Sequence, residues 1–191
     1  TEGLGMSLPG CASIPATLSE RAEMAYLTGL RIVEMVREDL TPTRIMTRKS
    51  FENVVVLNSA LGGSTNAPIH INAIARHVGV ELKIEDWQKI GFEIPLLVNM
   101  QPSGKYLGED FYRAGGVPAV INSLLAAGKL NDNAITANGK TIAENYDQTP
   151  ILDKDVIRTC DNPILKNAGF MILKGNICEA AVMKTSVISE N

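Results

Sequence analysis

The sequence predicts an α/β fold in which helices dominate the first part of the chain and strands appear near its end. Apolar residues recur at helical spacing in three segments, which are residues 17–38, 66–78 and 118–127. Alternating or continuous apolar runs bounded by turn residues indicate strands at residues 94–100, 168–174 and 181–188. With 191 residues, 45% of them apolar, the chain can bury the core of one domain or of one domain and part of another.

Residues 17–38 form the longest predicted helix, with Thr17 or Ser19 available as its N-cap. Its apolar stripe consists of Ala22, Ala25, Tyr26, Gly29, Ile32, Val33 and Val36. A glycine inside a helix costs about 1 kcal/mol relative to alanine, so we expect another backbone to pass close to Gly29. Pro42 ends the helical pattern, because the residue before a proline disfavours helical geometry.

The next segment, residues 51–61, is ambiguous. Its run of β-branched residues, Val54 to Leu57, is typical of a buried strand, yet Phe51, Val55 and Leu61 also fit a helical stripe. Periodicity alone does not decide between the two. The following helix, residues 66–78, is clearer, because Ile71, Ile74, Ala75 and Val78 lie on one face.

Between these segments stands "GGSTN", residues 62–66. The glycine pair frees the backbone, while Ser64, Thr65 and Asn66 place polar side chains at a helix N-terminus. Unpaired N–H groups and the helix dipole favour an anion there. The alternative is ordinary capping of the helix by Thr65 or Asn66.

The later elements follow from turn residues. After the strand at 94–100, the turn "QPSGKY" leads to a helix at residues 108–114 that Gly115 and Gly116 end, and the next helix opens on Pro118. A short strand, a turn at Asn138 and Gly139, and one or two helical turns come next. The charged stretch 147–163 is the predicted linker before the final strands.

Composition excludes several functional classes. The net charge of −3 comes from 18 basic and 21 acidic residues that are interspersed, so no basic face indicates nucleic acid or an anionic membrane. No apolar run approaches the roughly 20 residues that span a bilayer, and the start lacks the features of a signal peptide. We expect a cytoplasmic protein whose partners are small molecules or other proteins.

Several motifs have simpler interpretations. "NGKT" and "SGKY" lack the preceding glycine of a phosphate-binding P-loop. His70 and His77 share a helix face without a carboxylate or thiolate at metal-ligand spacing. Adjacent Glu109 and Asp110 diverge on a helix and indicate a solvated first turn. Three scattered cysteines indicate neither a disulfide framework nor a zinc site; they are Cys11, Cys160 and Cys178.

Six stretches, in the same order, resemble the iron–sulfur dehydratases, a family that includes dihydroxy-acid, phosphogluconate and sugar-acid dehydratases. They are "GLGMSLPGCASIPA", "FENVVVLNSALGGSTNAPIHINAIARHVGVEL", "PLLVNMQPSGKYLGEDFYRAGGVPAV", "NGKTIAEN", "NAGFMILKGN" and "VMKTSVIS". "PGCASIPA" and "STNAPIHINAIARH" look closer to the arabinonate or xylonate branch. The resemblance covers nearly the whole chain.

The resemblance implies a hydro-lyase acting on a 2,3-dihydroxy acid. In such enzymes a base removes the C2 proton, while an iron–sulfur cluster, 2Fe–2S or 4Fe–4S, and Mg²⁺ act as Lewis acids on the substrate oxygens. The C3 hydroxyl leaves and a 2-keto-3-deoxy acid results. The family's cluster cysteines, magnesium ligands and serine base match no position between Thr1 and Asn191, so we expect no catalytic or metal-ligating residue in this chain.

The chain is therefore expected to be an internal piece of a longer, homo-oligomeric enzyme, as its non-methionine start and strand-like end also indicate. The resemblance implies that residues 1–165 form the latter part of the N-terminal α/β domain and residues 166–191 the first strands of a C-terminal β-barrel domain. It also favours a helix at 48–61 over the strand. The candidate residues for a substrate or anion pocket are Ser64, Thr65, Asn66, Ser103 and Lys105.

Two other functions stay open. The first is the dihydroxy-acid dehydratase of branched-chain amino-acid biosynthesis, which the same resemblance allows. The second is a non-catalytic α/β binding module that keeps the scaffold without the cluster. Finally, six apolar residues near the end should be left partly exposed when the chain is seen alone; they are Phe170, Ile172, Val182, Met183, Val187 and Ile188.

Overall fold

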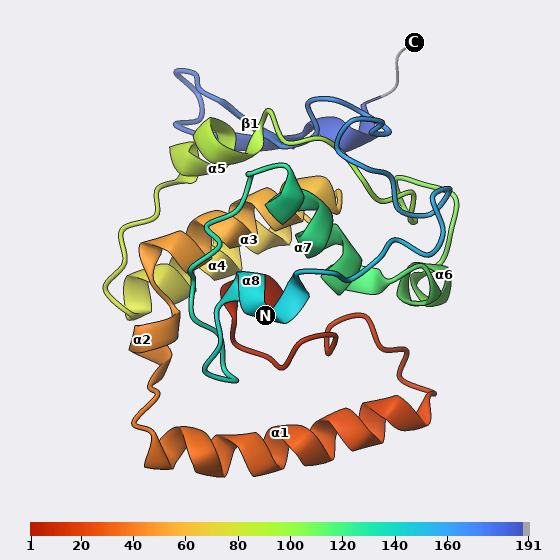
Figure 1. The fold of residues 1–191 in the computed structure, drawn as a ribbon. Coiled ribbons are helices and arrows are strands. Elements are labelled where there is room, and N and C mark those ends of the chain that lie inside the picture. Colours follow the sequence, from red (N-terminus) through yellow and green to blue (C-terminus); the bar gives the residue numbers. More distant parts are fainter. Residues whose placement is uncertain (189–191) are drawn as a thin grey trace.

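The computed structural model describes residues 1–188, which form a mixed α/β structure that is mostly helical (Figure 1). The helices are α1 (Ser19–Arg37), α2 (Pro42–Ile45), α3 (Arg48–Ala60), α4 (Asn66–His77), α5 (Ile84–Gly91), α6 (Gly108–Arg113), α7 (Gly116–Ala126) and α8 (Ile142–Tyr146). Two strands, β1 (Phe170–Leu173) and β2 (Ala181–Lys184), and two 3₁₀ turns, Glu2–Leu4 and Thr185–Val187, complete it.

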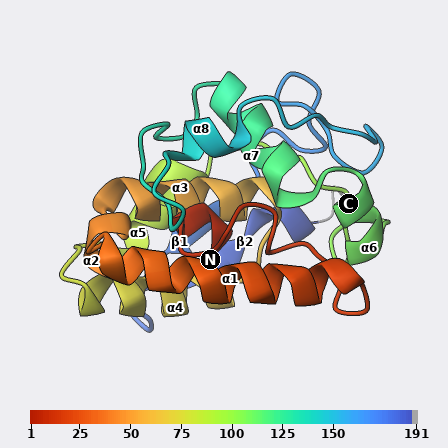
Figure 2. The same cartoon turned by 60° about the horizontal axis from the view of Figure 1, so that its bottom comes forward.

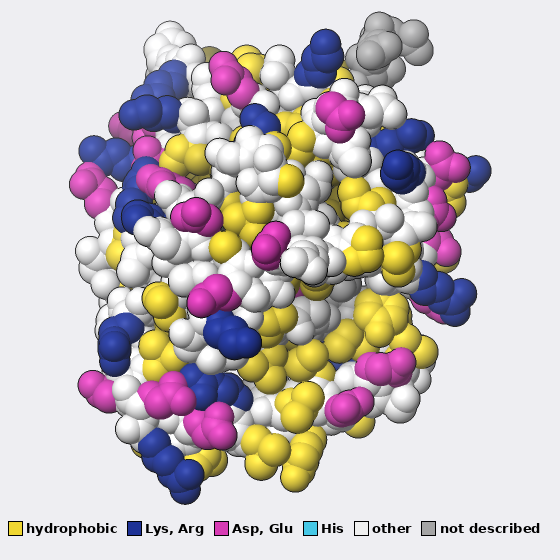
Figure 3. Space-filling model, in the orientation of Figure 1, with side chains coloured by type: hydrophobic (Ala, Val, Ile, Leu, Met, Phe, Trp, Pro, Cys, Tyr) yellow, Lys and Arg dark blue, Asp and Glu magenta, His cyan; other side chains and the backbone are white. Residues whose placement is uncertain are grey.

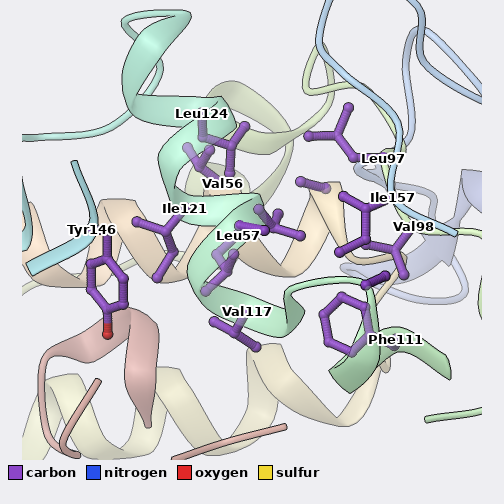
Figure 4. Packing of buried hydrophobic residues seen from close by; sticks show 14 of the residues in the cluster. Val56, Leu57, Leu97, Val98, Phe111, Val117, Ile121, Leu124, Tyr146 and Ile157 are labelled. Atoms are coloured by element: carbon purple, nitrogen blue, oxygen red, sulfur yellow. The ribbon is translucent and has the colours of Figure 1, made fainter. Parts of the chain in front are cut away.

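The main core lies between α3 and α7 and is closed by two extended segments, residues 94–98 and 156–157. Figure 4 shows its side chains converging from these elements. The labelled members are Val56, Leu57, Leu97, Val98, Phe111, Val117, Ile121, Leu124, Tyr146 and Ile157. Since α7 is almost entirely apolar, it can be buried on most of its circumference.

The ambiguous segment is helical. α3 runs from Arg48 to Ala60, and both Phe51 and Val55 are fully buried in it. The N-terminal 3₁₀ turn, α4, α5 and α7 all contact α3. A central helix surrounded in this way needs apolar residues on several faces, which explains why its sequence also has the continuous apolar run of a buried strand.

The predicted helices at 17–38, 66–78 and 108–114 are confirmed as α1, α4 and α6. α7 begins at Gly116, two residues before the predicted start at Pro118. α2 and α5 were not among the predicted elements. α5 is only eight residues long, yet its Trp87 is fully buried.

The predicted strand at 94–100 is extended but belongs to no ladder in the described part of the chain. It makes isolated antiparallel bridges, Leu96 to Leu165 and Val98 to Ile157. These partners show that residues 147–163 are not a loose linker, because Val156 and Ile157 are buried in the main core. Residues 147–165 form neither a helix nor a strand, so their pairing with residues 94–100 is limited to these isolated bridges.

β1 and β2 pair antiparallel, with Phe170 opposite Lys184 and Leu173 opposite Ala181. This hairpin packs on α5: the Phe170 and Trp87 ring centroids are 5.8 Å apart, and Gln88 Oε1 accepts a hydrogen bond of 2.7 Å from the Ile172 backbone N–H. Phe170 is buried, so the expectation that it would be partly exposed is wrong.

The other five residues that were expected to be partly exposed differ in their exposure. Ile172, Val182 and Met183 are half-buried, whereas Val187 and Ile188 are more than half exposed. The second strand ends at Lys184 and gives way to a 3₁₀ turn, so the prediction of a strand to residue 188 is wrong. The part of that segment beyond 188 lies outside the described residues.

α1 runs along the edge of the molecule, below the other helices in Figure 1 and nearest the viewer in Figure 2. Buried Met35 packs with Ile45 and Ala137, and Arg31 Nε donates a hydrogen bond of 2.7 Å to the Ala137 carbonyl. Apart from the helix's own backbone, no described atom lies within 4 Å of the position that a Cβ on Gly29 would take. The expected close backbone at Gly29 is therefore absent within residues 1–188.

Within residues 1–188, none of the helices has both the length and the apolar character that crossing a membrane requires.

Candidate functional site

The glycine pair of "GGSTN" ends α3. Gly62 adopts a left-handed conformation, with φ of 61°, which a residue without Cβ adopts at little cost. Its N–H donates to the Ser59 carbonyl at 3.1 Å, and the Gly63 N–H donates to the Asn58 carbonyl at 2.7 Å. This pair of bonds is a Schellman motif, which satisfies the last carbonyls of a helix. The glycines therefore have a structural role.

The polar residues that follow begin α4. Ser64 Oγ accepts a hydrogen bond of 3.1 Å from the Asn66 backbone N–H, whereas the Thr65 side chain makes no capping bond. Thr65 occupies the N-cap position, as one of the two predicted caps, but the side-chain capping bond comes from Ser64 instead. Ser64, Thr65 and Asn66 are all exposed.

The fold brings Ser103, Lys184 and Ser186 to this turn. A Cβ on Gly62 would lie 3.2 Å from Ser103 Oγ and 3.7 Å from Ser186 Oγ. Lys184, the last residue of β2, donates a hydrogen bond of 2.6 Å from Nζ to the Gly62 carbonyl. We call Gly62, Ser64, Ser103, Lys184 and Ser186 the glycine-turn cluster.

Asn99 holds the loop that carries Ser103. Asn99 Oδ1 accepts a hydrogen bond of 2.9 Å from the Lys105 backbone N–H, and its Nδ2 donates to the Asp155 carbonyl at 3.2 Å. A Cβ on Gly104 would lie 2.4 Å from the Asn99 backbone, so only glycine fits there. The Lys105 ammonium is exposed and lies 5.4 Å from the Tyr106 ring centroid, outside the cluster.

The cluster is rich in hydrogen-bond donors. Lys184 is half-buried, and burial lowers the pKa of its ammonium. Ser186 Oγ is buried and has no hydrogen-bond partner among residues 1–188. An ammonium, serine hydroxyls and the N-terminus of a twelve-residue helix can together bind an anionic or hydroxylated ligand.

Lys184 and Ser186 were not among the sequence-predicted site residues. They lie about 120 positions after Gly62, in "VMKTSVIS", and no local pattern distinguishes their side chains from those of a solvated strand end. Only the packing of the β1–β2 hairpin on α5 brings them to the glycine turn.

A second polar group lies inside the protein. The Glu2 carboxylate is 2% exposed and accepts hydrogen bonds from Gly10 N–H at 2.7 Å, Ala12 N–H at 2.9 Å and the Tyr146 hydroxyl at 3.0 Å. Burial raises the pKa of Glu2, although these hydrogen bonds oppose the shift. The pKa of Tyr146 is also raised, first by burial and then by the nearby carboxylate. These contacts fix the N-terminal loop to α8.

The other candidates are dispersed. All three cysteines are free thiols, with Cys160 next to Ser123 and Cys178 exposed near the hairpin turn. His70 and His77 are both exposed, and Glu109 pairs with Arg113 in the first turn of α6. Within the described range, no three His, Cys, Asp or Glu side chains come together in a way that could hold a metal ion.

Two neighbouring surface hollows lie elsewhere. One of about 490 Å³ is bounded by α7 and residues 149–161, and a neighbouring one of about 400 Å³ includes Lys129 and Lys166. Cys160 and Asp161 line both. None of the sequence-predicted pocket residues lines either hollow.

Comparison with known proteins gives the family. Residues 1–145 match the model of the dihydroxy-acid/6-phosphogluconate dehydratase N-terminal family. The chain is 51% identical over 189 residues to the D-xylonate dehydratase of Caulobacter vibrioides, covering 99% of this chain and 32% of that protein. It is 46% identical over 190 residues to the L-arabonate dehydratase of Azospirillum brasilense, covering 98% of this chain and 33% of the relative.

A dihydroxy-acid dehydratase from Ignicoccus hospitalis is 42% identical over 189 residues, covering 98% of this chain and 34% of that protein. The chain thus spans about one third of the length of the curated relatives that it matches. The family model covers three quarters of the chain. The chain belongs to the dihydroxy-acid/6-phosphogluconate dehydratase family.

Proposed function

We propose that the full-length protein is a hydro-lyase that dehydrates a 2,3-dihydroxy sugar acid to a 2-keto-3-deoxy acid. The observation that carries the proposal is the 51% identity with a D-xylonate dehydratase over nearly the whole chain, compared with 42% to 45% for dihydroxy-acid dehydratases. Relatives named for L-arabonate and L-arabinonate, at 46% and 45% identity, point to the same class of substrate.

The catalytic cofactors would be held by residues outside this chain. The described residues do not fit an iron–sulfur cluster or a Mg²⁺ site, because their cysteines are separate and their acidic groups do not converge. We therefore assign no cluster ligand, magnesium ligand or general base to this chain. Its contribution would be to bind and orient the substrate.

The glycine-turn cluster is the part of this chain that we propose contacts the substrate. Ser64 and Ser103 offer hydroxyls, Lys184 offers a positive charge, and Thr65 and Asn66 stand at the same helix N-terminus. Lys105 is exposed two residues after Ser103 and would guide the anion toward the site rather than hold it. This donor set suits the carboxylate and the hydroxyls of a sugar acid.

Steady-state kinetics of the full-length enzyme test the reaction. We expect release of a keto acid from D-xylonate or L-arabinonate with a higher kcat/KM than from 2,3-dihydroxyisovalerate. A clear preference for dihydroxyisovalerate would select the branched-chain enzyme instead. A protein that releases no keto acid from any of the three, and lacks the brown colour of an iron–sulfur protein, would select the non-catalytic binding module.

Substitution of Lys184 tests the site. Lys184→Met keeps the length of the side chain but removes its charge, and charge-assisted hydrogen bonds contribute about 1.5–3 kcal/mol. We expect kcat/KM to fall about 10- to 100-fold, mainly through KM. Lys174→Met is the matched control, because Lys174 lies on the same hairpin and pairs with exposed Glu85. Equal kinetics of the two variants would exclude the cluster as the substrate site.

Two further features belong to this proposal. We expect the enzyme to be a cytoplasmic homo-oligomer whose small-molecule substrate binds without nucleic acid or membrane. We also expect residues 1–165 and 166–191 to belong to its N-terminal α/β and C-terminal β-barrel domains. The hairpin of residues 170–184 would then be the first part of the second domain.

A further inference from the structure

α1 is amphipathic, but its apolar face points away from the protein. The side that contacts the body is partly polar: Arg21 donates to the backbone carbonyls of Cys11 and Ile14, and Arg31 donates to Ala137. The opposite side is the predicted stripe, and every member of it is exposed; the stripe is Ala22, Ala25, Tyr26, Gly29, Ile32, Val33 and Val36.

The exposure of this stripe is large. Tyr26 is 68% exposed, Val33 50% and Val36 76%. Figure 3 shows hydrophobic side chains along the lower edge of the molecule, where α1 lies. A stripe of this kind on one face of a long helix marks a surface that another element covers.

The order of residue sizes along the stripe indicates that a second α1 helix covers it. Two small residues, Ala22 and Ala25, precede Gly29, and the larger Val33 and Val36 follow it at matching distances, whereas Tyr26 and Ile32 are both large. In an antiparallel pair of α1 helices that crosses at Gly29, residues equally far before and after Gly29 face each other. Ala22 then meets Val36, and Ala25 meets Val33. The third pair is Tyr26 with Ile32, and Gly29 at the centre lets the two backbones approach closely.

The charges beside the stripe fit the same arrangement. At 100° per residue, Glu23 and Arg37 lie on one flank of the stripe, about 120° and 80° from Gly29. In the antiparallel pair, Glu23 of one helix lies on the same flank as Arg37 of the other, offset by about 3 Å along the axis. Among residues 1–188, the ion pairs of α1 join Arg31 to Glu34 and Glu38, which leaves Glu23 and Arg37 for this contact.

We propose that the stripe on α1 is an interface with a second copy of this protein, in which the two α1 helices cross antiparallel with Gly29 on the twofold axis. Such an interface is isologous, so each favourable contact occurs twice. The proposal rests on the homo-oligomer proposed above and names the surface that forms it. It does not depend on the substrate or on the glycine-turn cluster.

A cysteine on the twofold axis provides the first test. In the full-length protein, a cysteine at position 29 would face its own copy, within the Cα separation of about 4.4–6.8 Å that a disulfide requires. We expect Gly29→Cys to give a covalent dimer on mild oxidation, above the background of the unsubstituted protein. Leu27→Cys is the matched control, because residue 27 is exposed on the same helix but lies about 160° from Gly29.

A charge exchange provides the second test and does not alter the apolar stripe. Glu23→Arg and Arg37→Glu should each weaken dimer association at least about tenfold in sedimentation equilibrium, because like charges then face each other. The double variant restores opposite charges and should recover most of the affinity. The proposal would be overturned if the double variant recovered none of the dimer affinity and Gly29→Cys and Leu27→Cys crosslinked equally.

The outcomes also separate this proposal from the one on which it rests. A full-length protein that is monomeric contradicts both the homo-oligomer and the α1 interface. A stable oligomer that neither crosslinks through position 29 nor responds to the charge exchange keeps the homo-oligomer and excludes α1 as its surface. In that case another part of the same polypeptide covers the stripe.

Discussion

At the scale of single residues, the two glycines of "GGSTN" are required for different reasons. Gly62 needs its left-handed backbone, and its neighbours Leu96 and Ser103 leave no room for a side chain. Gly63 needs space, because a Cβ there would lie 2.0 Å from Asn58 Oδ1. The sequence predicted a break between two helices, but not which neighbours crowd it, because those neighbours come from distant segments.

Gly62→Ala tests this explanation. A left-handed backbone costs a residue with Cβ about 1–2 kcal/mol, and the contacts at 2.9 Å to Leu96 and 3.2 Å to Ser103 should add overpacking of about 1–3 kcal/mol. Gly79→Ala is the control: Gly79 has φ of 76° but nothing within 4 Å of the added Cβ. In urea unfolding we expect Gly62→Ala to lose clearly more stability than Gly79→Ala. Equal losses of stability in the two variants would show that crowding by Leu96 and Ser103 contributes nothing.

The buried Glu2 carboxyl predicts a pH dependence. Its pKa is raised above the usual 4.5 mainly by burial, so folding takes up a proton between pH 4.5 and the raised pKa. The stability that Glu2 contributes is therefore largest below about pH 4.5, decreases as pH rises to the raised pKa, and is constant above it.

Glu2→Gln is the reference for this pH dependence, because it cannot ionise. We expect the free energy of unfolding of the unsubstituted protein, minus that of Glu2→Gln, to fall across this pH range. At neutral pH the variant should still be less stable, by about 1–3 kcal/mol, because Gln cannot accept both backbone N–H groups. A difference that rises with pH would show that the hydrogen bonds outweigh burial.

At the scale of elements, sequence periodicity found the helices α1, α4 and α7 and the two hairpin strands, and turn residues found α6. Periodicity could not decide whether the α3 segment is a helix or a strand, because a central helix with apolar residues on several faces has the same local pattern as a buried strand. It predicted a strand at residues 94–100, where the structure has only isolated bridges. An extended apolar segment becomes a strand of a sheet only if the segment beside it is also extended and pairs with it continuously. It did not find α5, which is short and gains its stability from buried Trp87.

The contact between the hairpin and α5 predicts the effect of a core substitution. Phe170 is buried between Trp87 and Val55, so Phe170→Ala should cost about 3–5 kcal/mol. Leu173 is on the same strand but 47% exposed, and Leu173→Ala should cost much less. Chemical unfolding of the two variants measures both. Similar small losses would mean that the hairpin does not pack on α5 as described.

At the scale of the whole molecule, the candidate site could be predicted only in part. "GGSTN" and Ser103 were found because glycines and hydroxyl residues form a local pattern. Lys184 was not found, because its contact with Gly62 spans 122 positions and depends on where the hairpin packs. Lys105 was predicted from the same turn as Ser103, yet its side chain turns toward Tyr106.

The apolar surface of the whole chain leads to the last prediction. The exposed apolar side chains on residues 1–188 include the α1 stripe and the pair Val187 and Ile188, which are 55% and 56% exposed. Each such side chain gains about 1.5–3 kcal/mol when it is fully buried. The 191-residue chain expressed alone should therefore bind a hydrophobic dye or self-associate, whereas the full-length protein should bind much less dye.

Lysine substitutions show which region is responsible. Val33→Lys with Val36→Lys places charges in the α1 stripe, and we expect this variant of the isolated chain to bind less dye and to self-associate less. Ala73→Lys with Ala127→Lys adds two lysines at exposed neutral positions outside α1 and controls for the change in net charge, which is the same in both double variants. If both double variants lower dye binding equally, charge explains the effect. If neither does and the isolated chain unfolds cooperatively as a monomer, the chain buries its apolar surface without the rest of the enzyme.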